Sequence, residues 1–173
     1  LWLAPSQRSA EQIRHALLRE GQSGCLAPGV MTFDQFAQQI VRASGQDVRP
    51  LSGTMKRHLL RRSIDEMHAA GQLATLSSIA ATPGLVDELA QWITELKRHE
   101  IWPENLAEAL ARARLSPKDY ELHALYERYQ NLLLRHQLYD AEGQFWLARQ
   151  TIEEGSRDPF GAVRYLVVDG FSD

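Results

Sequence analysis

The sequence lacks the features that mark disulfide-rich, metal-binding and membrane proteins. Its single cysteine, Cys25, cannot form an internal disulfide, and its six histidines show neither HExxH nor paired-ligand spacing. No apolar run approaches the roughly 20 residues that cross a bilayer, and no signal peptide is visible. This pattern is typical of a cytoplasmic protein that has no membrane partner.

Positive charge is also scarce. The 173 residues hold 19 Lys and Arg against 22 Asp and Glu, and the net charge is −3. Because a dedicated nucleic-acid-binding domain is usually basic, any DNA contact must be local. The length suffices for one domain with a real core, or for a small core with an insertion. The first residue is Leu1 rather than methionine, so we expect a piece of a longer protein.

The first 45 residues alternate between strand and helix patterns. Leu1–Pro5 is typical of a short buried strand, and Ser9 begins a capping box that opens a helix ending near Glu20. Val30–Phe33 predicts a second strand. Thr32 begins another capping box, so a second helix should follow that strand directly.

Helical patterns dominate from about residue 46. Cap residues and helix-initial prolines predict five helices, which begin near Ser52, Thr82, Trp102, Ser116 and Asp140. We expect Asp140 to act as a helix cap rather than in catalysis. Several aromatic residues have helical spacing and are expected in the core: Trp92, Trp102, Tyr126, Tyr129 and Trp146. Val163–Val168 then predicts a final strand.

This order of elements predicts a mainly α protein with a small parallel β-sheet. Helices connect the predicted strands, so the strands should be parallel neighbours. Strands at both ends of a helical block indicate one α/β core that is interrupted by an insertion. We assign residues 1–45 and 158–173 to the core and residues 46–157 to the helical insertion.

The last eight residues, LVVDGFSD, carry the most informative pattern. An apolar run that ends in an acid is how a buried parallel strand delivers a carboxylate to the C-terminal edge of a sheet. The acid here is Asp169, and the next residue is Gly170. Glycine has no side chain, so it can do no acid–base chemistry.

Four segments resemble motifs of UvrD/Rep-like superfamily 1 helicases in matching order. LAPSQRSAEQIRHAL resembles the strand and helix that follow the P-loop, and VMTFDQFAQQIV resembles the next, TFxxF-type motif. YQNLLLRHQLYDAEGQFWLA resembles the helices before the Mg²⁺-binding strand, and LVVDGFSD falls at the DExxD motif. The VDGF variant is similar to the inactivated helicase-like N-terminal region of AddAB-type helicase–nuclease B subunits and related PD-(D/E)XK nuclease family proteins.

The resemblance implies a partial P-loop NTPase (RecA-like) α/β core with a 1B-like helical insertion subdomain. The sequence departs from active helicases in three ways: no GxxxxGK[ST] loop is present, Gly170 replaces the catalytic glutamate, and Ser172 replaces the glutamine that senses the γ-phosphate. We therefore expect no enzyme activity and no cofactor in this fragment. ATP and Mg²⁺ remain possible in the parent protein, where Asp169 is the candidate metal ligand.

Two candidate DNA contacts follow predicted strands. Ser6, Gln7 and Arg8 precede a helix N-terminus, where N–H groups and an arginine suit a phosphate. Thr32 and Phe33 lie in the motif that touches single-stranded DNA in the helicases, and a hydroxyl and an aromatic ring suit a phosphate and a base. The alternatives are an ordinary capped loop, a helix cap and a core residue.

A third candidate is a basic patch on one predicted helix, made of Lys56, Arg57, Arg61 and Arg62. Four cations within seven residues suit a DNA backbone. The alternative is a solvated helix face.

The resemblance thus implies a fragment of a DNA-repair or recombination helicase–nuclease subunit. It would act in double-strand-end processing as a catalytically inactive, helicase-like DNA-binding scaffold, with single-stranded or end-unwound DNA and a helicase–nuclease partner subunit as its partners. One alternative is part of an active superfamily 1 ATP-dependent helicase. The other is a helical protein–protein adaptor without a DNA role, which salt-dependent DNA binding would distinguish from a scaffold.

Overall fold

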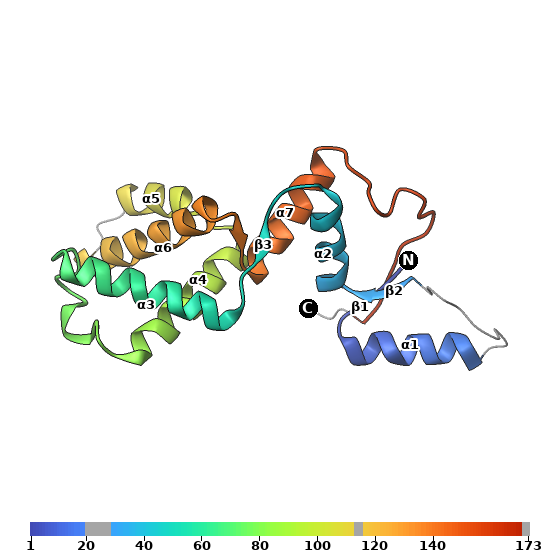
Figure 1. The fold of residues 1–173 in the computed structure, drawn as a ribbon, viewed down its shortest axis with the longest axis horizontal. Coiled ribbons are helices and arrows are strands. Elements are labelled where there is room, and N and C mark those ends of the chain that lie inside the picture. The colour runs from blue at the N-terminus through green and yellow to red at the C-terminus, as the bar shows by residue number, and fades with distance from the viewer. Residues whose placement is uncertain (20–28, 113–115, 171–173) are drawn as a thin grey trace. The chain divides into compact units, whose positions relative to one another are not determined.

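The structure is a computed structural model that describes residues 1–19, 29–112 and 116–170. The chain divides into two compact units (Figure 1). The first consists of Leu1–Gln46 and Gln144–Asp173, and the second is Asp47–Gly143.

The second unit is shorter than the insertion that the sequence analysis assigned. It ends at Gly143, not at residue 157, so most of helix α7 (Ala141–Glu153) groups with the first unit. The physical reason is side-chain contact: Gln144 Nε2 donates a hydrogen bond to the Asp34 carbonyl at 2.9 Å, and Ile152 lines the same apolar groove as Phe36. Apolar spacing along α7 could not show which unit it faces.

Three short parallel strands form a sheet in the first unit, in the order β2-β1-β5. They are β1 (Trp2–Ala4), β2 (Val30–Thr32) and β5 (Val167–Val168). The parallel pairing of the three predicted strands is confirmed. β5 is shorter than predicted because only Val167 and Val168 pair with β1, opposite Trp2 and Leu3.

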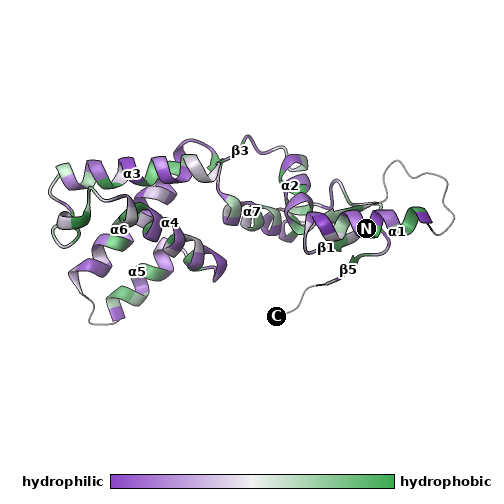
Figure 2. Ribbon diagram, turned by 90° about the horizontal axis from the view of Figure 1, so that it is seen from below, coloured by the Kyte–Doolittle hydropathy of each residue, from purple (hydrophilic) through white to green (hydrophobic). Residues whose placement is uncertain are grey.

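Two helices follow the first two strands. α1 (Gln7–Arg19) contributes Ala10 to a cluster with Ala4 and Val30, and α2 (Phe33–Ala43) buries Ile40 and Val41. In Figure 2 apolar and polar residues are interleaved along the helices, as expected for helices with one buried side.

The start of α1 corrects one sequence prediction. The helix begins at Gln7, and the Ser6 hydroxyl, not that of Ser9, acts as the cap by accepting the Ser9 N–H at 3.1 Å. Ser6 is the cap because it immediately precedes the first helical residue and stands three residues before an N–H group that has no partner within the helix. The second capping box is confirmed: Thr32 Oγ1 accepts the Gln35 N–H at 3.2 Å, and Gln35 Oε1 accepts the Thr32 N–H at 3.0 Å.

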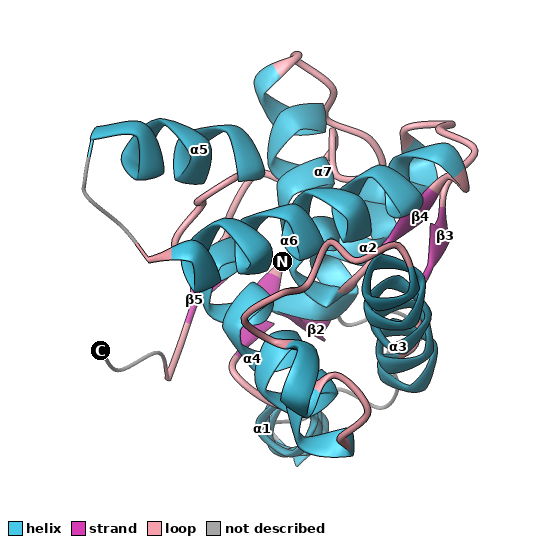
Figure 3. Ribbon diagram, turned by 90° about the vertical axis from the view of Figure 1, so that its left-hand side faces the viewer, coloured by secondary structure: helices cyan, strands magenta, loops and turns pink. Residues whose placement is uncertain are grey.

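The second unit is built from four helices and a short 3₁₀ turn in its described residues (Figure 3). The elements are α3 (Gly53–Ala69), η1 (Ser77–Ile79), α4 (Pro83–Arg98), α5 (Pro103–Arg112) and α6 (Pro117–Arg135). Their starts match the predicted caps, and Tyr126 and Tyr129 lie in the core as expected. Trp102, in contrast, is 38% exposed.

A two-stranded parallel sheet in this unit was not predicted. It pairs β3 (Arg49–Pro50) with β4 (Leu138–Tyr139). Strands of two residues are too short to show the alternation by which strands are recognised. None of the described helices is long and apolar enough to span a bilayer.

Candidate nucleic-acid interface

The carboxyl ends of the three parallel strands meet at one edge of the first unit's sheet. Asp169, just after β5, donates its N–H to the Leu3 carbonyl of β1 at 3.2 Å. A Cβ placed on Gly170 would lie only 3.2 Å from Cγ of Pro5, which follows β1. The ends of β1 and β5 are therefore in contact, as expected at the ligand-binding edge of an open parallel sheet.

The ends of β1 and β2 are joined through two glutamines. Gln35 Nε2 donates a hydrogen bond to Gln7 Oε1 at 3.3 Å, so the first residue of α1 is tied to the first turn of α2. Two of the three sequence-predicted DNA segments, Ser6–Arg8 and Thr32–Phe33, are thereby brought together.

Thr32 and Phe33 differ in how far they are free to contact a ligand. Thr32 is 8% exposed, and its hydroxyl oxygen is engaged in the capping box. Phe33 is 37% exposed and packs edge-to-face on Phe36, with 6.4 Å between ring centroids. Phe33 is therefore not the fully buried core residue of the alternative interpretation, and part of its ring is accessible.

Ser6 and Arg8 are both exposed at the same edge. The Ser6 hydroxyl caps α1 and lies 2.9 Å from the Ser9 hydroxyl. The Arg8 side chain makes no hydrogen bond or ion pair with any other described residue. Its guanidinium is therefore available for an anion without first breaking a contact.

Asp169, the candidate metal ligand, belongs to no metal-binding group among the described residues. No group of three or more His, Cys, Asp and Glu side chains in the described ranges could hold a metal ion. A single exposed carboxylate binds Mg²⁺ weakly unless phosphate oxygens complete the coordination shell. The described residues therefore do not by themselves fit Mg²⁺, and the predicted neighbours Ser172 and Asp173 lie outside them.

The basic patch lies on α3 in the other unit, and its exposed arginines are already paired. Arg57 Nε lies 2.7 Å from an Asp87 carboxylate oxygen, and Arg62 Nε lies 2.7 Å from one of Glu66. Hydrogen bonds from Arg62 and then Arg128 hold the pKa of Glu66 below its usual value. A DNA phosphate would have to replace these carboxylates.

The other two members of the patch are tied to the protein more firmly. Arg61 donates to the carbonyl of Ala80 and lies 3.0 Å from Asp65. Lys56 is only 9% exposed, and its Nζ donates to Thr94 Oγ1 at 2.8 Å. Burial therefore removes Lys56 from any surface patch, which the sequence spacing alone could not reveal.

Asp140 is the centre of a buried charged cluster that the sequence analysis missed. It caps α7 as predicted, because its Oδ1 accepts the Gly143 N–H at 2.9 Å. The same carboxylate lies 2.6 Å from Lys97 Nζ and 3.8 Å from Lys56 Nζ, and it accepts the Tyr129 hydroxyl at 3.0 Å. Asp140 is 2% exposed and Lys97 is 1% exposed.

The cluster shifts the pKa values of both main partners. Burial alone would raise the pKa of Asp140, but Lys97, Lys56 and the Gly143 N–H together hold it below its usual value. Burial lowers the pKa of Lys97, and Asp140 opposes that shift. The sequence held one signal: Lys97 follows Leu89 and Ile93 at four-residue spacing, on the apolar side of α4.

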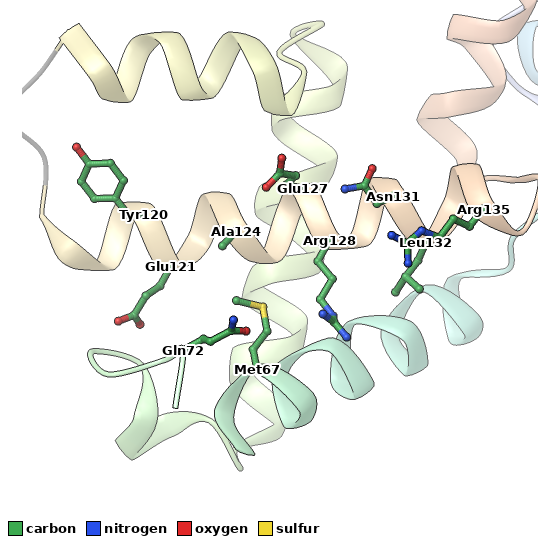
Figure 4. A pocket seen from close by; sticks show the side chains of 10 residues that line it. All are labelled: Met67, Gln72, Tyr120, Glu121, Ala124, Glu127, Arg128, Asn131, Leu132 and Arg135. Atoms are coloured by element: carbon green, nitrogen blue, oxygen red, sulfur yellow. The ribbon is translucent and has the colours of Figure 1, made fainter. Parts of the chain in front are cut away.

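A groove of about 450 Å³ runs along α6 in the second unit (Figure 4). Glu121 lines it and accepts the N–H groups of Thr75 and Leu76 at 2.7 and 2.9 Å. Arg128, which also lines it, pairs with Glu66 of α3. These charges hold the unit together, and no sequence-predicted site residue lines the groove.

Comparison with known proteins places these features in a family context. The chain matches the sequence model of the family described as "ADDB, N-terminal" over residues 1–173. It is similar to proteins named as the B subunit of an ATP-dependent helicase/deoxyribonuclease: 26% identical to that of Carboxydothermus hydrogenoformans over 99% of this chain, and 28% identical to that of Alkaliphilus metalliredigens over 98%. The chain spans about 15% of the length of both relatives.

A third relative is more similar over a shorter stretch. The protein of the same name from Pelotomaculum thermopropionicum is 33% identical over 109 residues, which are 62% of this chain and 9% of that protein. The similarity therefore covers the N-terminal family region and not the whole of these relatives.

Proposed function

This chain belongs to the ADDB N-terminal family, and from this premise we propose that it is a helicase-like DNA-binding scaffold within a helicase–nuclease subunit. In this proposal the first unit is a partial RecA-like core related to superfamily 1 helicases, and the second is a 1B-like insertion. The parent protein processes double-strand DNA ends together with a helicase–nuclease partner subunit. The family match, and the names of the relatives, support the setting.

The carboxyl edge of the sheet supports a DNA-binding role for the first unit. Just after neighbouring parallel strands it gathers an accessible aromatic ring, Phe33, and a cation whose side chain has no partner among the described residues, Arg8. A ring that stacks on a base and a guanidinium that contacts a phosphate are the two elements of sequence-tolerant single-strand binding. Ser6 completes the proposed contact surface, whereas the Thr32 hydroxyl and Gln7 Oε1 are already engaged by Gln35.

The scaffold in this proposal does not hydrolyse ATP. Gly170 has φ +72°, a conformation that disfavours any larger residue, and a Cβ there would press on Pro5. The site is thus shaped for glycine at the position where helicases carry the catalytic glutamate. Phosphate release should stay at background with and without single-stranded DNA. Turnover that Asp169→Ala abolishes would show that the edge is an active ATPase site, as the helicase alternative requires.

The DNA-binding role can be tested with single-residue variants of the full-length gene product. Arg8→Gln should flatten the salt dependence of single-strand binding by about 0.7 units of log–log slope, the value for one phosphate contact. Arg19→Gln is the matched control, because Arg19 is exposed at the other end of the same helix. The Arg19 change should leave the slope unaltered.

The aromatic contact has its own pair of variants. Phe33→Leu should weaken binding roughly tenfold because stacking is lost, whereas Phe33→Tyr should retain it. If Arg8→Gln and Phe33→Leu both bind like the wild type, the edge is not a DNA site. The adaptor alternative, which needs no DNA contact, would then be the better interpretation.

A further inference from the structure

Gln35 makes two hydrogen bonds that serve different purposes. Its Oε1 accepts the Thr32 N–H at 3.0 Å, which completes the capping box of α2. Its Nε2 donates to Gln7 Oε1 at 3.3 Å, which connects α2 to the first residue of α1. The first bond stabilises the start of α2, whereas the second plays no part in the cap.

We infer that Gln35 is a positioning residue, whose bridge to Gln7 fixes the spacing between Arg8 and Phe33 and so governs single-strand binding. The inference rests on the proposed function. Gln7 precedes Arg8, and Thr32 precedes Phe33, so the bridge joins the backbone segments that carry the two contact groups. One DNA strand can use both groups at full strength only if their separation is already set before binding.

The choice of glutamine supports this role. A capping box works equally well with glutamate or glutamine at its fourth position, because only an acceptor is required. An amide, unlike a carboxylate, also carries a donor N–H. Gln35 is therefore the residue type that can both cap α2 and reach Gln7, and Gln35→Glu separates the two purposes.

Two charge-matched variants test the bridge by fluorescence anisotropy with a labelled oligothymidine and the full-length gene product. Gln35→Glu keeps the cap but removes the donor. Gln7→Glu adds the same charge nearby but keeps the acceptor for Gln35. We expect Gln35→Glu to bind about fivefold more weakly than Gln7→Glu, the effect of losing one ordinary hydrogen bond.

A double variant provides the rescue. Gln7→Lys with Gln35→Glu restores the bridge as an ion pair and keeps the net charge of the wild type, so its affinity should lie within about twofold of wild type. Equal losses in the two single variants, or no recovery in the double variant, would overturn the inference. So would a fall in the melting temperature of Gln35→Glu, because the bridge would then be structural. If Arg8→Gln and Phe33→Leu leave binding unchanged, the proposed function fails instead.

Discussion

In the second unit, Asp47–Gly143 (the helical unit), Ile93, Leu125 and Tyr126 are fully buried. In the first unit, which carries the β2-β1-β5 sheet (the strand-bearing unit), Tyr165 and Leu166 immediately before β5 are 81% and 54% exposed. The same contrast holds for charge. In the helical unit Arg57, Arg62 and Lys97 form ion pairs with Asp87, Glu66 and Asp140, whereas the Arg8 side chain of the other unit has no partner among the described residues.

This contrast separates residues that maintain the fold from residues that are free to bind. A cation already satisfied by a carboxylate gains little by exchanging it for a phosphate. A cation that has only water as its partner gains the full effect of counterion release. The two units are therefore expected to respond differently to the same kinds of substitution.

The largest effect should come from breaking the buried ion pair of the helical unit. Lys97→Met leaves Asp140 as a buried charge without its closest partner, which should lower the free energy of unfolding by about 3–5 kcal/mol. Urea denaturation followed by circular dichroism measures this loss. Arg57→Met, which breaks an ion pair whose side chains are about 60% exposed, is the control and should barely move the midpoint.

A second variant shows whether charge or packing causes the loss. Lys97→Met combined with Asp140→Asn leaves no buried unpaired carboxylate, and the amide oxygen can still cap α7. The double variant should therefore be more stable than Lys97→Met alone. If the double variant is less stable than Lys97→Met, the cluster stabilises the unit through packing. The difference between the units would then not be a difference in how they use charge.

The next largest difference between the units should be the loss of stability when an apolar side chain is truncated. Ile93→Ala, at a fully buried position, should cost about 2–5 kcal/mol because it leaves a cavity. Leu166→Ala in the strand-bearing unit should cost much less, since more than half of that side chain is already in contact with solvent. Urea midpoints of the two variants, measured side by side, test the contrast. Equal losses would contradict it.

The sequence could predict most of the fold because its signals are local. Capping residues and helix-initial prolines located the helices of the second unit, and apolar runs located three strands whose connections force parallel pairing. It could not predict β3 and β4, because two residues carry no periodicity. It also could not assign α7 to a unit, since that depends on the hydrogen bond from Gln144 to Asp34, 110 residues away along the chain.

The candidate site was predictable only in part for the same reason. The strand ends that carry Ser6–Arg8, Thr32–Phe33 and Asp169 could be expected at one edge, because parallel strands share their carboxyl edge. The burial of Lys56 could not be predicted, since the sequence does not distinguish four neighbouring cations whose partners lie on other helices. Lys97 and Asp140 are 43 residues apart, so their pairing has no local signal.

A third and smaller effect should be a loss of stability at low pH that comes from the buried cluster. The pKa of Asp140 is lower in the folded chain than its ordinary value near 4, so its stabilising contribution is present above that value and is lost as the pH falls through the folded pKa. Between about pH 5 and 3, the wild type should lose more stability than Asp140→Asn. If the stability of the two proteins falls equally with decreasing pH, Asp140 is not the group whose protonation causes the loss.

The smallest expected effect is that of the basic patch on single-strand DNA binding. It tests whether the paired arginines of the helical unit differ from Arg8 in their availability to DNA. Arg57→Ala with Arg62→Ala removes two exposed cations whose carboxylate partners lie 2.7 Å away, and leaves Arg61 to hold the carbonyl of Ala80. Because Asp87 and Glu66 already neutralise these arginines, single-strand affinity and its salt dependence in the full-length gene product should both stay unchanged.

If the arginines contact phosphates instead, the double variant should flatten the log–log slope by about 1.4 units, twice the value for one contact on a single strand. That result would mean that DNA competes successfully with the carboxylates, and that an ion pair seen in the unbound protein does not mark a cation as unavailable. An unchanged slope, beside a flatter one for Arg8→Gln, would confine the DNA contacts to the strand-bearing unit.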